Sequence, residues 1–207
     1  MKKRPFTLIE LLTVIVIIIV LAGLLLAAVT GSMKKANITK ARAQMTTLAN
    51  AIKQFEATYG RLPIPSGHDE KDVLSDNEYK WLILILQGET IDDSNNSSLK
   101  GYGKSASVNA KKVKFLNIVG NDPGVYQDPW DNDFKVFIDT SYDDKIEGSG
   151  NFINGLKGSK FHYKVMIYSL GPDEEHSSTV GNSANKDNVY SIDTKWNNED
   201  EGHEILK

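Results

Sequence analysis

Residues 6–29 read FTLIELLTVIVIIIVLAGLLLAAV, and they set the architecture of the 207-residue chain. The last nineteen of them, residues 11–29, carry no charge, and Thr13 is their only polar side chain. At about 1.5 Å of rise per residue, a helix over this run covers roughly 28 Å, close to the thickness of the hydrocarbon core of a bilayer. We therefore predict a transmembrane helix over about residues 11–29.

The residues ahead of this run favour a cytoplasmic N-terminus. Lys2, Lys3 and Arg4 precede it, and cations are enriched on the cytoplasmic side of membrane helices. A secretory signal peptide is a poor match, because its apolar core usually spans about 7–15 residues and this run is longer. The chain has no cysteine, so a domain outside the cytoplasm must be held together by its core, or by a metal, without disulfides.

The helical pattern continues beyond the apolar run as a single stripe. Its apolar positions are spaced by three and four residues, which places them on one face of a helix. They are Ile38, Ala41, Met45, Leu48, Ile52, Phe55 and Tyr59. Gly60 and Pro63 supply a stop. The sequence predicts one long helix over residues 6–60, apolar on all sides in its first half and amphipathic in its second.

Residues 61–207 have a different composition and indicate a small α+β domain. Residues 76–87 predict a helix with Asp76 as its N-cap, and the polar residues 91–110 predict a surface loop. Short clusters of β-branched and aromatic residues predict three strands, over residues 134–139, 161–169 and 188–192. The connections are short or rich in glycine, so we expect antiparallel pairing, with the long helix packed on this sheet.

The charge and the motifs argue against nucleic-acid binding and catalysis. The net charge of −3 gives no basic footprint for nucleic acid. The four histidines are far apart without a His-Glu-x-x-His pattern, and there is no cysteine nucleophile. The glycines form no phosphate-binding loop pattern. We expect no enzyme activity.

Glu10 is the most informative single residue. A carboxylate costs about 2.5 to 3.5 kcal/mol near the centre of a bilayer, so it needs a partner there. The alternative is that Glu10 lies at the level of the lipid headgroups and is hydrated.

Residues 3–12, KRPFTLIELL, resemble the processing site of type IV pilins and type II secretion pseudopilins. The resemblance implies that a basic leader, residues 1–5, is cut between Pro5 and Phe6 and that the new amine of Phe6 is methylated. It also implies that Glu10 guides assembly. A new ammonium on one subunit would neutralise the glutamate of its neighbour within an apolar bundle. Pro5 departs from the pattern, which usually has glycine at this position.

A second segment with the same resemblance is Asp128-Pro129-Trp130. Major pseudopilins carry a similar Asp-Pro-Trp-Gly-Asn-Pro segment before the first strand of their globular domain. Asp131 stands here in place of the glycine, and Asp133 in place of the second proline. We interpret Asp128-Pro129 as a turn and expect Trp130 to pack on the helix stripe.

The third segment is Tyr168-Ser169-Leu170-Gly171-Pro172-Asp173, which resembles the calcium-binding turn of major pseudopilins. The resemblance implies calcium ligands at Asp173, at Asp187 and at the carbonyl of Leu170. Calcium takes six to eight hard oxygens, which suits such a loop. Glu174 stands where the pattern has glycine. The alternative is a solvated acidic loop. Residues 139–144 also resemble the start of a calcium loop, but they lack the sixth-position glycine of an EF-hand, and we interpret them as a turn.

The resemblance implies a structural subunit of a type II secretion pseudopilus that polymerises through its N-terminal helix. Its location would be the bacterial inner membrane, single-pass, with residues 61–207 in the periplasm. The implied partners are other copies of the chain, minor pseudopilins, inner-membrane assembly proteins and a prepilin peptidase. The alternatives are a type IV pilin for adhesion, motility or DNA uptake, and a membrane-tethered binding protein that does not polymerise.

Overall fold

The computed structural model divides the chain into two compact units, Met1–Thr39 and Lys40–Lys207, and each is described by itself. It describes the backbone of residues 7–68, 73–91, 97–99, 101–118, 122–147, 152–153, 156–157, 160–175, 183–192, 194–197 and 202–205. Within these ranges the side chains of residues 25–30, 105–106, 147, 152–153, 156–157, 160, 183, 194–197 and 202–205 are not described.

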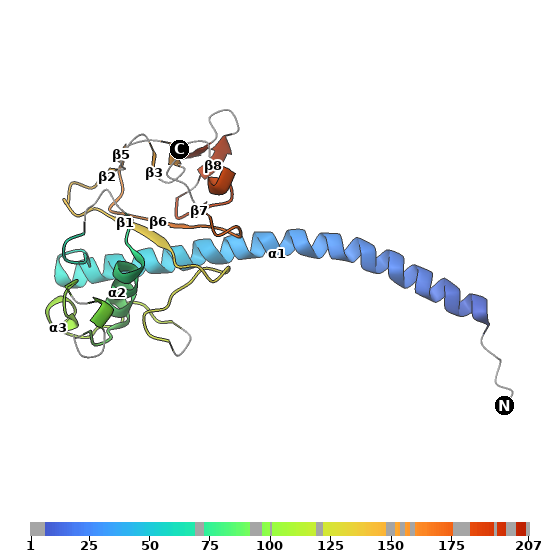
Figure 1. Ribbon diagram of the computed structural model, residues 1–207, viewed down its shortest axis with the longest axis horizontal. Helices are drawn as coiled ribbons and strands as arrows, with labels where there is room; N and C mark the ends of the chain where they lie inside the picture. Colours follow the sequence, from blue (N-terminus) through green and yellow to red (C-terminus); the bar gives the residue numbers. More distant parts are fainter. Residues whose placement is uncertain are drawn as a thin grey trace. The chain divides into compact units, whose positions relative to one another are not determined.

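The predicted long helix is present as α1, Leu8–Tyr59, and it runs through both units (Figure 1). Gly60 ends it with a φ of 69°, a left-handed conformation that glycine adopts without strain, and its N–H donates to the carbonyl of Glu56 at 2.7 Å. In the first unit every large apolar side chain between Leu8 and Leu24 is exposed, by 46 to 83%. No helix in the described part of the chain meets the length and apolarity required to cross a membrane.

In the second unit the amphipathic half of α1 buries its predicted stripe. Ala41, Met45, Leu48, Ile52 and Phe55 are completely buried, which confirms the periodicity over these positions. Tyr59, at the end of the stripe, is half-buried. The apolar face of this half of α1 is therefore the centre of the core of the second unit.

Helix α2, Asp76–Gln87, has the predicted bounds, but its N-cap is Ser75 and not Asp76. The hydroxyl of Ser75 accepts from the N–H of Glu78, and the carboxylate of Glu78 accepts from the N–H of Ser75 at 2.8 Å. This reciprocal capping box satisfies two backbone donors at once, which a cap at Asp76 would not do. The helix buries Trp81, whose indole N–H donates to the carbonyl of Gly103 at 2.7 Å.

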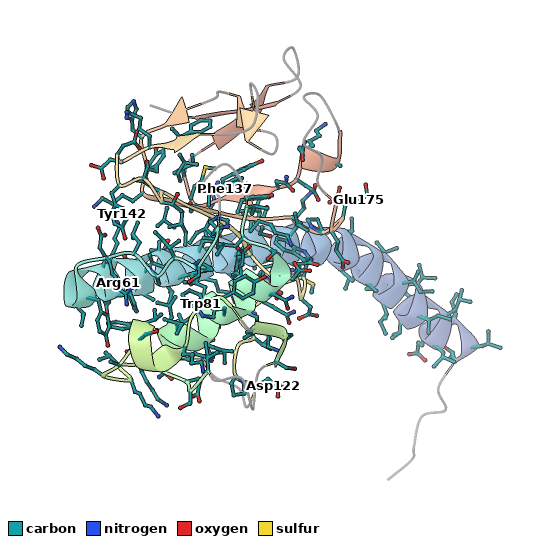
Figure 2. The ribbon with its side chains drawn as sticks, turned by 60° about the vertical axis from the view of Figure 1, so that its left-hand side comes forward. Arg61, Trp81, Asp122, Phe137, Tyr142 and Glu175 are labelled. Atoms are coloured by element: carbon teal, nitrogen blue, oxygen red, sulfur yellow. The ribbon has the colours of Figure 1, made fainter. Side chains whose placement is uncertain are left out.

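The three predicted strands form an antiparallel sheet in the order β1-β6-β7. Their bounds are Lys135–Ile138, Val165–Ser169 and Val189–Tyr190. Both views place this sheet along one side of the amphipathic half of α1 and α2 along the other, with Phe137 on the sheet side and Trp81 on the α2 side (Figures 1 and 2). The far face of the sheet is also covered, because Phe137, Met166 and Tyr168 belong to a buried apolar cluster. The α+β architecture is thereby confirmed.

Further short strands lie outside this sheet. Strands β2 and β5 form an antiparallel pair, and the remaining four follow the order β3-β4-β9-β8. Strand β4 pairs with β9 in parallel, and both lie outside the three strands for which the sequence predicted antiparallel pairing. Their bounds are Ile146–Glu147, Lys160–Phe161, Phe152–Ile153, Leu156–Lys157, Gly202–Ile205 and Thr194–Asn197 for β2, β5, β3, β4, β9 and β8.

The predicted surface loop over residues 91–110 is only partly a loop. It contains the 3-10 helix η1, Ser97–Leu99, and the short helix α3, Ser105–Val108. Ile91, Leu99 and Val108 are buried, so this polar segment contributes three isolated apolar side chains to the core. A further 3-10 helix, η2, spans Ser183–Asn185.

Candidate functional site

Glu10 lies in the first turn of α1 and caps the helix from within. Its carboxylate oxygen Oε2 accepts from the N–H of Thr7 at 2.9 Å and from the Thr7 hydroxyl at 2.8 Å. The N–H of Glu10 donates to the Thr7 hydroxyl at 3.3 Å. This is a capping box, in which two residues three positions apart satisfy each other's backbone donors. Glu10 therefore also has a local structural role, as part of the N-terminal cap of α1.

The predicted cleavage point lies outside the described residues. Residues 1–6, which include Pro5 and Phe6, are not described. The described residues begin at Thr7. Of the predicted processing and assembly region, the structure therefore describes the capping box but not the cleavage point. Cleavage and methylation remain predictions.

The Asp-Pro-Trp segment forms a turn around the buried carboxylate of Asp128. One oxygen, Oδ1, accepts from the N–H groups of Trp130 and Asn132, each at 2.9 Å. Trp130 is half-buried. The residues that tie this segment to α1 by hydrogen bonds are its neighbours, because Tyr126 donates to the carbonyl of Gln44 at 3.0 Å and Gln44 donates to the carbonyl of Gln127 at 2.8 Å. The interpretation as a structural turn is consistent with these bonds.

The second oxygen of Asp128 joins this turn to the candidate calcium segment. The hydroxyl of Ser169 donates to Asp128 Oδ2 and accepts from the N–H of Gly171 at 3.1 Å. Ser169 is completely buried at the end of β6. The two segments that resemble major pseudopilins, 41 positions apart at these residues, therefore share one buried hydrogen-bond network.

The structure brings the predicted ligands Leu170, Asp173 and Asp187 into one region. The turn at Gly171, between Leu170 and Asp173, comes very close to Asp187. If Gly171 carried a Cβ atom, that atom would lie 2.5 Å from the carbonyl oxygen of Asp187 and 3.1 Å from its Oδ2 atom. Burial and the nearby charge of Asp173 raise the pKa of Asp187 above its usual value. A carboxylate held beside a second negative charge in this way is a favourable position for a cation.

A buried amide next to this pair adds a further oxygen. Asn188 is 5% exposed, and no described group donates a hydrogen bond to its Oδ1 atom. With the predicted ligands, this segment would offer two carboxylates, one carbonyl and one amide oxygen, all hard ligands of the kind that calcium prefers. Among the described residues, no group of three or more His, Cys, Asp or Glu side chains is arranged to hold a metal ion.

The other acidic segment, residues 139–144, is a turn, as interpreted from its sequence. Asp139 is completely buried, and its oxygens accept from the N–H of Tyr142 at 2.7 Å and of Asp144 at 2.8 Å. The hydroxyl of Ser141 donates to the same carboxylate at 3.1 Å. These bonds direct the carboxylate of Asp139 to its own loop.

Ser169 and Asn188 are the site residues that the sequence reasoning did not select. Ser169 lies within the resembling segment but had no predicted role, and the buried state of Asn188 has no local signal in the sequence. Comparison with known proteins gives no assignment: no family model, no curated protein and no solved structure matches the chain.

Proposed function

We propose that this chain is a structural subunit of a filament of the type II secretion pseudopilus class, assembled through the N-terminal half of α1. The observation that carries the proposal is the continuous exposure of the large apolar side chains from Leu8 to Leu24. Soluble monomers rarely expose a contiguous apolar surface of this extent, so the surface needs a lipid or protein partner. We propose a bilayer for the single subunit and the same helix of neighbouring copies for the filament.

In this proposal Glu10 has two roles in the same subunit. Its Oε2 atom caps α1 through Thr7, and its second oxygen, Oε1, accepts the ammonium of a neighbouring copy after cleavage at Phe6. A buried charge is tolerated only with a partner, so the neighbour's ammonium would make one axial position more favourable than the others. The cap also fixes the direction of the carboxylate before the neighbour arrives.

We further propose that Leu170, Asp173 and Asp187, together with Asn188, hold a calcium ion in the second unit. The support is the negative charge of Asp173 near Asp187 and the unpartnered buried amide oxygen of Asn188, the next residue along the chain. A bound cation would remove the repulsion and tie the turn after β6 to the segment before β7. This site would stabilise the subunit and take no part in the assembly contact at Glu10.

The experiment that tests the filament proposal separates the charge of Glu10 from its cap. Glu10→Gln keeps an acceptor oxygen for Thr7, as glutamine does in other capping boxes, but it removes the charge. We expect Glu10→Gln to abolish filaments in an assembly assay with the complete secretion machinery, while the helix content in circular dichroism stays unchanged. Thr7→Val is the matched control, because it removes the capping hydroxyl and keeps the charge, and it should still assemble.

Intact mass measurement on the same membranes reports processing directly. We expect the loss of residues 1–5 and one added methyl group on Phe6 in both variants and in the unchanged chain. An intact leader together with no filament would contradict the proposal and favour a tethered protein that does not polymerise. Long surface filaments, rather than short periplasmic ones, would favour a type IV pilin.

A further inference from the structure

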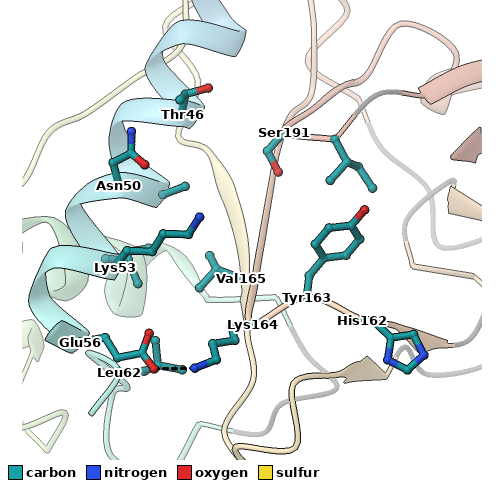
Figure 3. Close-up of a pocket in the computed structure, with 13 residues that line it drawn as sticks. Thr46, Asn50, Lys53, Glu56, Leu62, His162, Tyr163, Lys164, Val165 and Ser191 are labelled. Carbon is teal, nitrogen blue, oxygen red and sulfur yellow. Dashed lines mark hydrogen bonds and ion pairs between the residues drawn. The ribbon is translucent and has the colours of Figure 1, made fainter. Parts of the chain in front are cut away.

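The second unit contains a groove between α1 and the end of the sheet, with a volume of about 600 Å³. We call it the Lys53 groove. Thr46, Asn50 and Lys53 of α1 line one wall, and Tyr163, Val165 and Ser191 line the other (Figure 3). The ion pair between Lys164 and Glu56, at 2.8 Å, crosses between the two walls. The groove lies apart from the predicted calcium ligands, and none of its lining residues has a role in the filament proposal.

One wall of the Lys53 groove is an incomplete edge of the sheet. Strand β1 pairs with β6 from Val165 to Tyr168, whereas β7 pairs only with Tyr168 and Ser169. The chain after β7 still reaches Ile167, because the N–H of Ser191 donates to its carbonyl at 2.8 Å, and it then bends away at Ser191 and Ile192. Val165 is therefore paired on one side only among the described residues.

The direction of the backbone groups of Val165 follows from its neighbours. The carbonyl of Lys164 accepts from Asp139 at 2.9 Å, so residue 164 directs its backbone toward β1. Ile167 exchanges bonds with Ser191, so it directs its backbone to the opposite side. Backbone direction alternates along a strand, which places the N–H and the carbonyl of Val165 on the same side as those of Ile167. The N–H and the carbonyl of Val165 therefore face the position that a longer β7 would occupy.

On the opposite wall, the ammonium of Lys53 has no partner among the residues that the structure describes. Lys164 is neutralised by Glu56 and by Asp144, at 2.8 and 3.6 Å. No described residue forms an ion pair or hydrogen bond with Lys53, and Figure 3 shows its ammonium directed into the space between the walls. His162 also lines the groove. A ligand that fits must therefore offer backbone groups to Val165 and a negative charge to Lys53.

We propose that the Lys53 groove binds an extended segment of a partner protein that carries an acidic side chain. The segment adds as a short strand beside the start of β6 and exchanges two backbone hydrogen bonds with Val165. Its carboxylate pairs with Lys53, and the face of Tyr163 covers the neighbouring side chain. Strand addition to an exposed sheet edge is a common mode of peptide recognition, in which the backbone provides affinity and the side chains provide specificity.

The test uses fluorescein-labelled peptides and the full-length chain in detergent micelles. The probe is Thr-Val-Glu-Val-Thr with both ends blocked, so that its only carboxylate is the glutamate side chain. We expect saturable binding by fluorescence anisotropy, and about tenfold weaker binding when the glutamate is replaced by glutamine, since a charge-assisted hydrogen bond contributes about that factor. Lys53→Gln should weaken the acidic peptide to the same degree and leave the glutamine peptide unchanged.

Two controls identify the mode of binding. Lys40→Gln removes an exposed cation of the same helix that lies outside the groove, and it should not change the affinity. N-methylation of the peptide at alternate residues blocks one strand edge at a time, so one of the two methylated peptides should lose binding and the other should keep it. Equal affinity for the acidic and neutral peptides, or equal loss with both methylation patterns, would overturn the proposal.

Discussion

Asp131 and Glu174 take a left-handed backbone, with φ values of 65° and 61°. Both stand where the resembling pattern has glycine, and the structure gives the physical reason for that preference. A side chain with a Cβ atom costs about 1 to 2 kcal/mol in this conformation, whereas glycine adopts it freely. Asp131 and Glu174 therefore hold a conformation that glycine would adopt more easily, at a cost in stability.

Replacing these residues by glycine should stabilise the protein. We expect Asp131→Gly and Glu174→Gly each to raise the free energy of unfolding by about 1 kcal/mol, because the strain is relieved in the folded state. Urea unfolding followed by circular dichroism measures the change. Asp122→Gly and Glu175→Gly are matched controls without a positive φ, and they should lower the free energy of unfolding by up to about 1 kcal/mol. A loss at positions 131 and 174 equal to that of the controls would contradict the explanation.

The pKa of Asp187 predicts a dependence on pH and calcium. The pKa is raised in the folded state from its usual 3.8, so the folded chain binds a proton that the unfolded chain has released. The contribution of Asp187 to the free energy of unfolding is therefore most favourable at a pH below its usual pKa. It is lost as the pH rises through the raised pKa of the folded state. We expect Asp187→Asn to raise the Tm at pH 7 by at most about 2 °C, since Asp173 is exposed and solvent screens its charge, and not at pH 3.

Calcium should make the unchanged chain more stable than Asp187→Asn at pH 7. One millimolar calcium chloride should raise the Tm of the unchanged chain at pH 7 but not that of Asp187→Asn, since the variant loses a ligand charge. Asp122→Asn, at an exposed acidic residue, should respond as the unchanged chain does. An equal response of all three proteins would show that the ion is not held at Asp187.

At the scale of elements, α1 combines two surfaces with different needs in one helix. Its stripe from Ala41 to Phe55 is buried within the second unit, whereas its apolar residues up to Leu24 are exposed. The sequence distinguished these halves because their periodicity differs, all-round in the first and one-sided in the second. The N-cap of α2 was predicted wrongly because two good cap residues are adjacent. Ser75 and Glu78 form the Ser-x-x-Glu pattern of a capping box, but Asp76 is also a good cap residue.

The division of α1 predicts that its first half is dispensable for the fold of the second unit. A chain that begins at residue 33 keeps the entire buried stripe and removes the exposed apolar run. We expect this fragment to be a soluble monomer in gel filtration, with the same near-ultraviolet circular dichroism from its aromatic side chains as the full chain in detergent. A shorter fragment, residues 61–207, lacks the stripe and should fail to fold. Aggregation of the longer fragment would contradict the division.

At the scale of the whole molecule, local patterns predicted more than distant contacts did. Strands β1, β6 and β7 were predicted because each has a run of β-branched and aromatic residues, and their pairing followed from short connections. The parallel pairing of β4 with β9 had no such signal, because β4 has only two residues and shows no periodicity. Leu99 and Val108 escaped notice for a related reason, as single apolar residues in a polar segment.

The candidate site shows the same limit. Asp173 and Asp187 were selected as a pair from the resemblance, and the structure brings them together. The bond between Ser169 and Asp128 and the open edge at Val165 depend on how β6 meets distant parts of the chain. Such juxtapositions come from tertiary packing, to which local periodicity gives no access.

The apolar stripe of α1 is synthesised well before the sheet that covers it. Phe55 is synthesised long before Tyr190, the last residue of the sheet that covers this half of the helix. At about 5 to 20 residues per second, roughly 7 to 27 seconds separate the two. Until then the stripe is an uncovered apolar surface on a nascent polypeptide. The stripe must therefore be shielded during synthesis, and we expect a chaperone that binds apolar helices to contact the unfinished chain.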